Sequence, residues 1–273
     1  MSPTASDPLY RNAVKVHGTG ARTLMFAHGF GCNQTMWRHL IPFLQDSNRL
    51  VLFDYTGFGA SDADQFDRDR YAGLDGYVRD VIDICGALDL RDVTFVGHSV
   101  SSMIGLLAAI ERPGLFRNLV MICPSPSFVN ELPEYPGGFE REDLEELIEL
   151  VDRNAPDWAT YLAPIVMGAG NDPALTSELR DSFAGTDPGR ARVFARATFL
   201  SDCRNILPQS PVPALLLQSL QDNLAAPGVG AYMHKKMPQS RLETLDTIGH
   251  CMHMASPARV ADLINGFVQS QEI

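Results

Sequence analysis

Short apolar runs alternate with longer amphipathic stretches along most of this chain. Between two of the runs, apolar residues from Leu74 to Leu88 recur at helical spacing. The runs that predict buried strands are residues 23–27, 49–53, 93–96, 118–122, 214–219 and 242–245. Strands buried on both faces and joined by crossover helices are typical of parallel sheets. The pattern therefore predicts an α/β fold with an open, mostly parallel sheet.

The two ends of this pattern differ from its middle. Val14 and Val16 alternate with polar residues before a glycine-containing turn at residues 18–20. Such alternation followed by a turn predicts an edge hairpin that opens the fold. Residues 257–268 predict a closing helix.

A passage rich in proline and glycine interrupts the rhythm after Cys123. Four helical segments follow without intervening strands, and the strand pattern resumes at Ala214. We therefore expect residues 1–123 and 209–273 to form the core, and residues 124–208 to form a helical lid. Ligands of open α/β sheets bind at the carboxyl ends of the strands, so the lid would roof that edge.

Ser99 stands where a strand pattern ends and a helical pattern begins. The stretch Gly97-His98-Ser99-Val100-Ser101 resembles the G-x-S-x-G turn, which strains a serine and lifts its hydroxyl above the sheet. It predicts a nucleophile at Ser99, the alternative being a serine that caps a helix at an ordinary turn. Ser101, in place of the second glycine, and Ser102 are interpreted as helix residues. The His98 side chain should point away from the site.

Asp222 and His250 follow two successive predicted strands, at the same sheet edge as Ser99. The order serine, acid, histidine is typical of catalytic triads on such sheets. A histidine would take the serine proton during attack and return it to the leaving group. A carboxylate would hold the histidine in the required tautomer. We therefore predict a triad of Ser99, His250 and Asp222.

Nearby residues are rivals for two of these roles. His253 lies three residues after His250, and Asp246 precedes the histidine loop. We favour His250 because Gly249 before it suits an exposed loop. We favour Asp222 because Asp246 lies too close to the histidine along the chain. The histidine spacing alone, without a helix or a carboxylate partner, is too weak to predict a metal site, so we predict none.

Two backbone N–H groups are candidates for an oxyanion hole. A buried strand ends in His28-Gly29-Phe30-Gly31, and such glycines let backbone N–H groups turn toward a ligand. We predict the N–H of Phe30 as one donor and the N–H of Val100 as the other. His28 is interpreted as a structural histidine that supports the loop.

Composition and charge exclude several classes of partner. Phosphate binding needs clustered Lys and Arg, so a net charge of -11 argues against nucleic acid and anionic membranes. The first residues lack the pattern of a signal peptide, and no apolar run approaches a membrane span. Gly57 and Gly59 lack the rest of a dinucleotide fingerprint. We expect a soluble, cytoplasmic protein without a cofactor.

The five cysteines are odd in number, widely spread and without a C-x-x-C pair. They are interpreted as buried, inert thiols. Cys32 and Cys251 lie near the predicted site, so their modification could block activity.

Further motifs run along nearly the whole chain, from about Tyr10 to Val268. They are residues 28–37, Phe53-Asp54-Tyr55 with Gly57 and Gly59, residues 97–101, Ser125-Pro126, residues 135–140, residues 201–204 and Gly249-His250. With these motifs the chain resembles one branch of the α/β-hydrolases, which contains the bacterial stress-response regulator RsbQ and the plant karrikin and strigolactone receptors. Ser101 fits this branch, because the plant receptors resemble the chain there.

The resemblance implies an α/β-hydrolase domain with a four-helix, V-shaped lid and a Ser-His-Asp triad. It also implies a small, mostly apolar pocket, with packing in the lid or core as the alternative role of its aromatic residues. By motif match, the residues that would line this pocket are Phe30, Phe128, Phe139, Trp158 and Phe199.

The implied activity is slow hydrolysis of small esters or lactones, including butenolides, with a link to signalling. The alternative is a ligand receptor or stress-signalling regulator in which hydrolysis is incidental. A third reading is a hydrolase of carbon–carbon bonds that uses the same triad. The implied protein partner is a PAS-containing phosphatase for RsbQ-like proteins, and F-box and repressor proteins for the plant receptors.

Overall fold

A single mixed sheet forms the centre of the computed structural model, which describes residues 7–153 and 155–271. The strand order in this part of the chain is β1-β3-β2-β4-β5-β6-β7, and only the β1–β3 pair is antiparallel. The strands are β1 (Lys15–His17), β2 (Arg22–Ala27), β3 (Asn48–Leu52), β4 (Val93–His98), β5 (Phe116–Ile122), β6 (Ala214–Gln221) and β7 (Ser240–Ile248). The predicted α/β fold with a mostly parallel sheet is confirmed.

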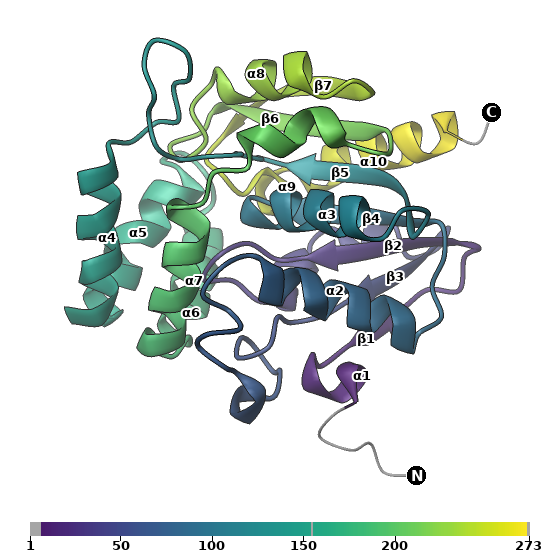
Figure 1. Cartoon of the computed structure of the whole chain (residues 1–273), viewed down its shortest axis with the longest axis horizontal. Coiled ribbons are helices and arrows are strands. Elements are labelled where there is room, and N and C mark those ends of the chain that lie inside the picture. The colour runs from purple at the N-terminus through teal and green to yellow at the C-terminus, as the bar shows by residue number, and fades with distance from the viewer. Residues whose placement is uncertain (1–6, 154, 272–273) are drawn as a thin grey trace.

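Helices cover both faces of the sheet (Figure 1). One face carries α2 (Asp75–Ala87), α3 (Val100–Glu111) and α8 (Val229–Lys236), and the other carries α9 (Met252–Ala255) and α10 (Pro257–Ser270). All six residues of β4 are buried, which explains why its sequence reads as a continuous apolar run. The short elements are α1 (Pro8–Arg11), η1 (Gln34–Trp37), η2 (Ile41–Phe43), η3 (Ala63–Gln65) and η4 (Arg204–Gln209).

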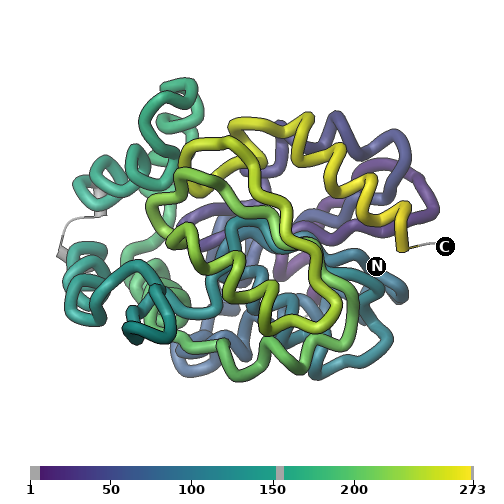
Figure 2. Tube along the Cα trace, turned by 90° about the horizontal axis from the view of Figure 1, so that it is seen from above, coloured from purple at the N-terminus to yellow at the C-terminus, as the bar shows by residue number. Residues whose placement is uncertain are grey.

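In the described part of the chain, four helices follow β5 and precede β6 in the sequence, and they project from one end of the molecule (Figures 1 and 2). They are α4 (Arg141–Arg153), α5 (Ala155–Met167), α6 (Pro173–Ala184) and α7 (Pro188–Phe199). We call them the insertion. Within it α5 packs on α6, and α4 packs on α7. The insertion lies at the carboxyl ends of the parallel strands, while α10 ends at the opposite end of the molecule (Figure 2).

The predicted hairpin at the start of the chain is wrong. β1 lies at the sheet edge, but it pairs antiparallel with β3, with Val16 opposite Val51. Both sides of β2 are already occupied by β3 and β4. The connection passes close to the loop before β3, since a Cβ at Gly18 would lie 2.2 Å from the Asn48 carbonyl oxygen. Gly18, with a φ of 70°, therefore lets the connection from β1 to β2 pass close to the backbone before β3, and it does not form a hairpin turn.

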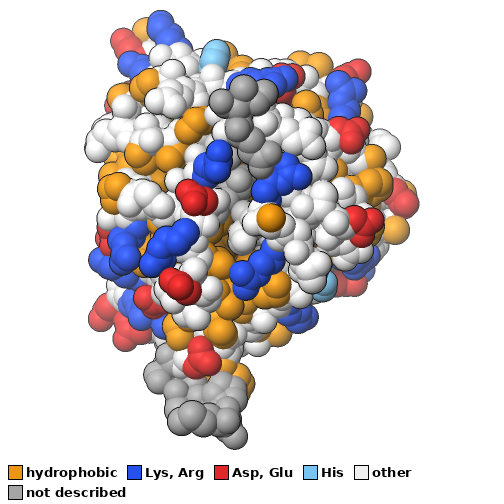
Figure 3. Space-filling view, turned by 90° about the vertical axis from the view of Figure 1, so that its right-hand side faces the viewer, with side chains coloured by type: hydrophobic (Ala, Val, Ile, Leu, Met, Phe, Trp, Pro, Cys, Tyr) orange, Lys and Arg blue, Asp and Glu red, His pale blue; other side chains and the backbone are white. Residues whose placement is uncertain are grey.

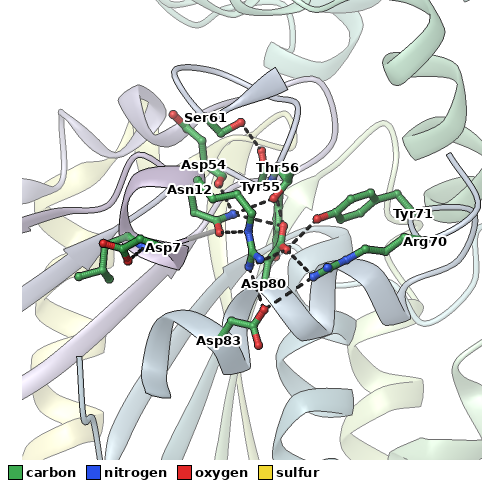
Figure 4. Close-up of polar contacts among 12 residues, drawn as sticks. Asp7, Asn12, Asp54, Tyr55, Thr56, Ser61, Arg70, Tyr71, Asp80 and Asp83 are labelled. Atoms are coloured by element: carbon green, nitrogen blue, oxygen red, sulfur yellow. Dashed lines mark hydrogen bonds and ion pairs between the residues drawn. The ribbon is translucent and has the colours of Figure 1, made fainter. Parts of the chain in front are cut away.

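A buried polar cluster ties α1, the loop after β3 and α2 together (Figure 4). At its centre the fully buried Asp80 carboxylate accepts hydrogen bonds from the Asn12 side chain (3.2 Å), the Thr56 backbone N–H (3.0 Å) and the Tyr71 hydroxyl (2.8 Å). Arg11 lies 3.4 Å from the same carboxylate. Burial raises the pKa of Asp80, and these partners oppose that rise. The cluster gives a buried acid the partners that burial requires.

The end of the molecule away from the insertion shows acidic and basic side chains interspersed, with hydrophobic side chains between them (Figure 3). In the part of this face that the structure describes, Lys and Arg side chains do not gather into the continuous basic patch that nucleic-acid binding uses. Among the described residues, no helix combines the length and apolarity needed to cross a membrane.

Candidate active site

Ser99 forms the turn between β4 and α3. Its φ of 56° and ψ of −124° lie in a region that non-glycine residues rarely adopt. The turn leaves no room for a side chain at Gly97, where a Cβ would lie 2.6 Å from the Ser101 carbonyl oxygen. The backbone N–H of Ser99 donates to the Ile122 carbonyl oxygen at 2.8 Å and fixes the turn to β5. The strained strand-turn-helix geometry thus matches the sequence pattern.

Asp222 and His250 lie at the ends of β6 and β7 and face each other. Nδ1 of His250 is 2.8 Å from Oδ2 and 3.0 Å from Oδ1 of Asp222. Asp222 also accepts hydrogen bonds from the backbone N–H groups of Leu224 (2.8 Å) and Ala225 (3.0 Å). Burial alone would raise the pKa of Asp222, but His250 and these donors bring it below its usual value. An ionised carboxylate accepts Nδ1–H, which leaves Nε2 of His250 as a proton acceptor.

The carboxyl end of α5 holds both loops in place. The His250 backbone N–H donates to the Val166 carbonyl oxygen at 2.7 Å. The Asn171 side chain donates to the Ile248 carbonyl oxygen at 2.9 Å, and the Asn223 side chain donates to the Ile165 carbonyl oxygen at 2.9 Å. The loops that carry Asp222 and His250 are therefore bonded to the insertion as well as to the sheet.

Replacing Gly249 by alanine should destabilise the protein strongly. Gly249 has a φ of 83°, and a Cβ there would lie 1.9 Å from the Met167 carbonyl oxygen. The clash is with backbone, so we expect the free energy of unfolding to fall by about 2 kcal/mol or more. Chemical denaturation measures this loss. The control is Gly266→Ala in α10, where a Cβ would meet nothing within 4 Å. Because alanine favours the helix over glycine, this variant should have a free energy of unfolding about 0.5–1 kcal/mol higher than wild type. Equal stability of the two variants would contradict the prediction.

A small enclosed cavity brings Ser99 and His250 together. Its volume is about 20 Å³, which is room for about one water molecule. Nε2 of His250 is buried and has no hydrogen-bond partner among the described residues. The lining residues are Phe30, Cys32, His98, Ser99, Leu162, Val166, Phe183, Thr198, Phe199, Leu224 and His250. Ser99 and an unpartnered imidazole nitrogen therefore share one mostly apolar cavity.

The aromatic residues expected to line the pocket separate into three groups. Phe30 and Phe199 line the cavity. Phe128 and Trp158 do not line it: Phe128 packs 5.3 Å from Phe199 and Trp158 packs 5.6 Å from Phe30, measured between ring centroids. Phe139 lies farther out, in a groove described below. The motif match located the aromatic cluster but not which rings reach Ser99.

Several lining residues were missed by the sequence analysis. Leu162 and Val166 follow Trp158 at intervals of four residues on α5, so they share one helix face with a residue that was predicted. That spacing was the available signal. The position of the others depends on packing between the insertion and the core, and these are Phe183, Thr198 and Leu224.

The two candidate oxyanion donors belong to residues next to the reacting serine: Phe30 lines the cavity, and Val100 follows Ser99 in the chain. Val100 is the first residue of α3, where a backbone N–H has no partner within the helix. In the described part of the chain, neither this N–H nor that of Phe30 donates to another protein group. A Cβ at Gly29 would lie 2.5 Å from Nδ1 of His98, so a glycine lets the Phe30 loop approach β4 closely.

Hydrogen bonds with His28 and Asp54 support the loop that carries Phe30 and the segment after it. His28 is fully buried, with Nδ1 2.9 Å from the Gly29 carbonyl oxygen, and Nε2 accepts from the Tyr55 backbone N–H at 3.2 Å. The buried Asp54 carboxylate accepts from the backbone N–H (2.6 Å) and side-chain amide (2.9 Å) of Gln34. The interpretation of His28 as structural agrees with these contacts.

His98 does not point away from the site as expected. Its ring centroid lies 4.9 Å from that of His250, and its Nε2 is 2.9 Å from the His250 carbonyl oxygen. The histidine loop passes directly over the end of β4, which brings the ring and the carbonyl together. Burial and the neighbouring His250 lower the pKa of His98 to about 3, and burial lowers the pKa of His253 well below its usual value. Both are therefore neutral, supporting side chains at neutral pH.

The sequence profile of the Alpha/beta hydrolase family matches residues 24–263. The chain belongs to this family. A karrikin insensitive 2 receptor of Petunia hybrida is 39% identical over 89% of this chain and 90% of its own. A strigolactone esterase of Pisum sativum is 35% identical over 91% of this chain and 93% of its own. A solved hydrolase from Oleispira antarctica has a TM-score of 0.95 and 46% identity, and covers 98% of both chains.

These relatives confirm the resemblance to the karrikin and strigolactone proteins and the prediction of a hydrolase. The resemblance to the bacterial regulator RsbQ stays a prediction.

A larger groove lies outside the cavity of this hydrolase, between α4, α5 and the loop after β6. Its volume is about 780 Å³. Leu162 and Leu224 line both the groove and the cavity, so the two are separated only by side chains. The groove also carries the acidic residues Asp143, Glu146 and Glu149. The groove adjoins the cavity that Ser99 lines, and its negative charge disfavours anionic ligands.

One group of described residues brings three metal-ligating side chains together. Atoms of Cys123, Asp222 and His250 lie within 4.8 Å of one another. Burial and the facing Asp222 raise the pKa of the Cys123 thiol well above its usual value, which disfavours the thiolate that a metal would need. Because Asp222 and His250 already bond to each other, we interpret the group as part of the hydrogen-bonded site. All five cysteines of the hydrolase are buried and unpaired.

Proposed function

We propose that this protein is a serine hydrolase of small, mostly apolar esters or lactones. The observation that carries the proposal is that strained Ser99 and the unpartnered Nε2 of His250 line one cavity, while Nδ1 of His250 is bonded to the buried Asp222. This is the arrangement in which a weak serine nucleophile is activated by an oriented base.

The proposed reaction has two halves. Oγ of Ser99 attacks the carbonyl carbon while Nε2 of His250 takes the hydroxyl proton. The carbonyl oxygen becomes an oxyanion, stabilised by the N–H groups of Phe30 and Val100. Collapse breaks the ester C–O bond, His250 protonates the leaving alkoxide, and an acyl group remains on Ser99. Water then attacks this acyl group with the same histidine as base, releasing the carboxylic acid.

The lining of the cavity supports the substrate class. Its walls are mostly aliphatic and aromatic, and they include Phe30 and Phe199, whose ring centroids lie 5.3 Å apart. At about 20 Å³ the cavity is too small for an ester, so substrate can enter only when side chains or helices of the insertion move apart. We therefore propose that the insertion, together with the rest of residues 124–208, acts as a lid. The relatives named for strigolactone hydrolysis and karrikin reception favour small lactones, including butenolides.

A second candidate is a ligand receptor, of the stress-regulator type represented by RsbQ, in which hydrolysis is slow and incidental. The observation that favours it is the 39% identity to a protein named as a receptor. The closed cavity also suits slow exchange of ligand. A signalling protein would then bind the liganded form, and a PAS-containing phosphatase is the partner expected for the RsbQ-type alternative.

Mass spectrometry of the intact protein tests the proposal. Wild type and Ser99→Ala are incubated separately with a fluorogenic butenolide and with a simple acetyl ester, and protein mass and product are followed together. We expect Ser99-dependent product with wild type, and neither product nor acyl adduct with Ser99→Ala.

The two functions differ in the lifetime of the adduct. Rapid turnover with little adduct supports an ordinary esterase, and slow turnover with a persistent adduct on Ser99 supports the receptor. Turnover that survives in Ser99→Ala would refute the serine mechanism for both.

A further inference from the structure

The cavity beside Ser99 contains one other hydroxyl, that of Thr198. Thr198 belongs to α7 and is only 1% exposed. Its buried helix neighbours Phe194, Ala195 and Ala197 are apolar. Among the residues that line the cavity, Ser99 and Thr198 alone carry hydroxyl groups. Helix α7 therefore contributes one polar side chain to the lining of the cavity that Ser99 also lines.

The Thr198 hydroxyl has no hydrogen-bond partner among the described residues. A threonine in a helix ordinarily satisfies its hydroxyl on the carbonyl one turn earlier, and here that oxygen belongs to Phe194. Ser201 shows the local alternative, since its hydroxyl donates to the Thr198 carbonyl oxygen at 3.1 Å. A buried hydroxyl without a partner costs folding free energy. The free hydroxyl is thus left for whatever occupies the cavity.

We propose that Thr198 is a specificity-determining residue, which hydrogen-bonds a second polar atom of the substrate besides the reacting carbonyl. The inference rests on the proposed serine hydrolase and narrows its substrate class. The favoured ester or lactone carries a further oxygen or other hydrogen-bonding atom within its small acyl or alcohol part. A purely hydrocarbon analogue leaves the hydroxyl unpaired in the complex, and sites of this kind reject such analogues.

Matched esters that differ by one atom test this inference. For the acyl part, the pair is the 4-nitrophenyl ester of tetrahydrofuran-3-carboxylic acid and that of cyclopentanecarboxylic acid. For the alcohol part, the pair is the acetate of 3-hydroxytetrahydrofuran and cyclopentyl acetate. The quantity measured is the ratio of kcat/KM for the oxygen-containing ester to that for its hydrocarbon partner. Because intrinsic reactivity is the same for every protein, only the change of this ratio between wild type and variants is interpreted.

We expect Thr198→Val to lower the ratio by at least about tenfold for one of the pairs, since a methyl group replaces the hydroxyl. The hydrocarbon ester should be hydrolysed faster by this variant than by wild type, while Thr198→Ser should keep most of the preference. An unchanged ratio for both pairs, with turnover that still depends on Ser99, would overturn the inference and leave the proposed hydrolase intact. Turnover that persists in Ser99→Ala would instead refute the hydrolase, and the inference with it.

The melting temperature of the ligand-free protein gives an independent test. Thr198→Val removes a buried hydroxyl that has no protein partner, so Tm should rise. A fall in Tm would show that the hydroxyl is held by the protein itself, which contradicts its availability to a substrate. The two measurements together separate a specificity residue from a structural one.

Discussion

Ser99→Ala should lower kcat/KM for an activated acetyl ester by about 10⁴-fold or more, or to the uncatalysed rate. Oγ of Ser99 is the protein atom that forms a bond to the acyl carbon in the proposed mechanism. Without it, the oxyanion donors and the cavity can still bind the ester, but His250 has no nucleophile to activate. The measurement is the steady-state rate after subtraction of spontaneous hydrolysis.

The matched control for this variant is Ser102→Ala. Ser102 lies in the first turn of α3, is also buried, and donates its hydroxyl to the Gly97 carbonyl oxygen at 3.1 Å. It therefore carries the same hydroxyl group three residues after Ser99, but it does not line the cavity. We expect this variant to retain most of its activity. A comparable loss in both variants would mean that the turn, and not the Ser99 hydroxyl, is what the substitution disturbs.

Asp222→Asn should lower kcat by about 10³–10⁴-fold with little change in folding. The amide is nearly isosteric with the carboxylate, but its NH₂ group can turn toward Nδ1 of His250. That contact favours the tautomer with the proton on Nε2, which cannot accept the Ser99 proton. The residual rate should rise with pH, because hydroxide then takes over the role of the base. A pH–rate profile from pH 6 to about 10, which brackets the unperturbed histidine pKa, measures both effects.

Asp246→Asn is the control, because Asp246 was the rival acid in the sequence. Its side chain lies on the exposed side of β7, and Asp222 alone of the two bonds to His250. The variant should keep the activity and pH profile of the wild type. If it loses activity as Asp222→Asn does, the assignment of the acid is wrong.

The order of the core elements could be predicted because burial leaves a strong local signal. Residues 93–98 are buried on both faces, so β4 reads as an apolar run that ends at the serine turn. Pairing of strands leaves no such local signal. Val14 and Val16 suggested a hairpin, whereas β1 pairs with β3 because β2 already has two neighbours.

The candidate site also has one part that the sequence could predict, the triad residues, and one part that it could not, the wall of the cavity. Ser99, Asp222 and His250 each follow a strand, and the topology of a parallel sheet brings strand ends together whatever the side chains do. The wall of the cavity depends instead on how helices of the insertion pack on the core. The sequence therefore predicted Trp158 as a lining residue, whereas the residues of α5 that line the cavity are Leu162 and Val166, on the same helix face. Nothing in the local sequence indicated that Thr198 would lack a partner.

The bonds from the carboxyl end of α5 to the loops after β6 and β7 make these segments one cooperative unit. Any local unfolding that lifts this end of α5 must break the hydrogen bond from the His250 backbone N–H to Val166, and with it the support of the histidine. If the proposed lid opens by lifting this end of α5, substrate enters in a state in which the base is not assembled. Each turnover would then include reassembly of the base, and the frequency of that step would set an upper limit on the rate of hydrolysis.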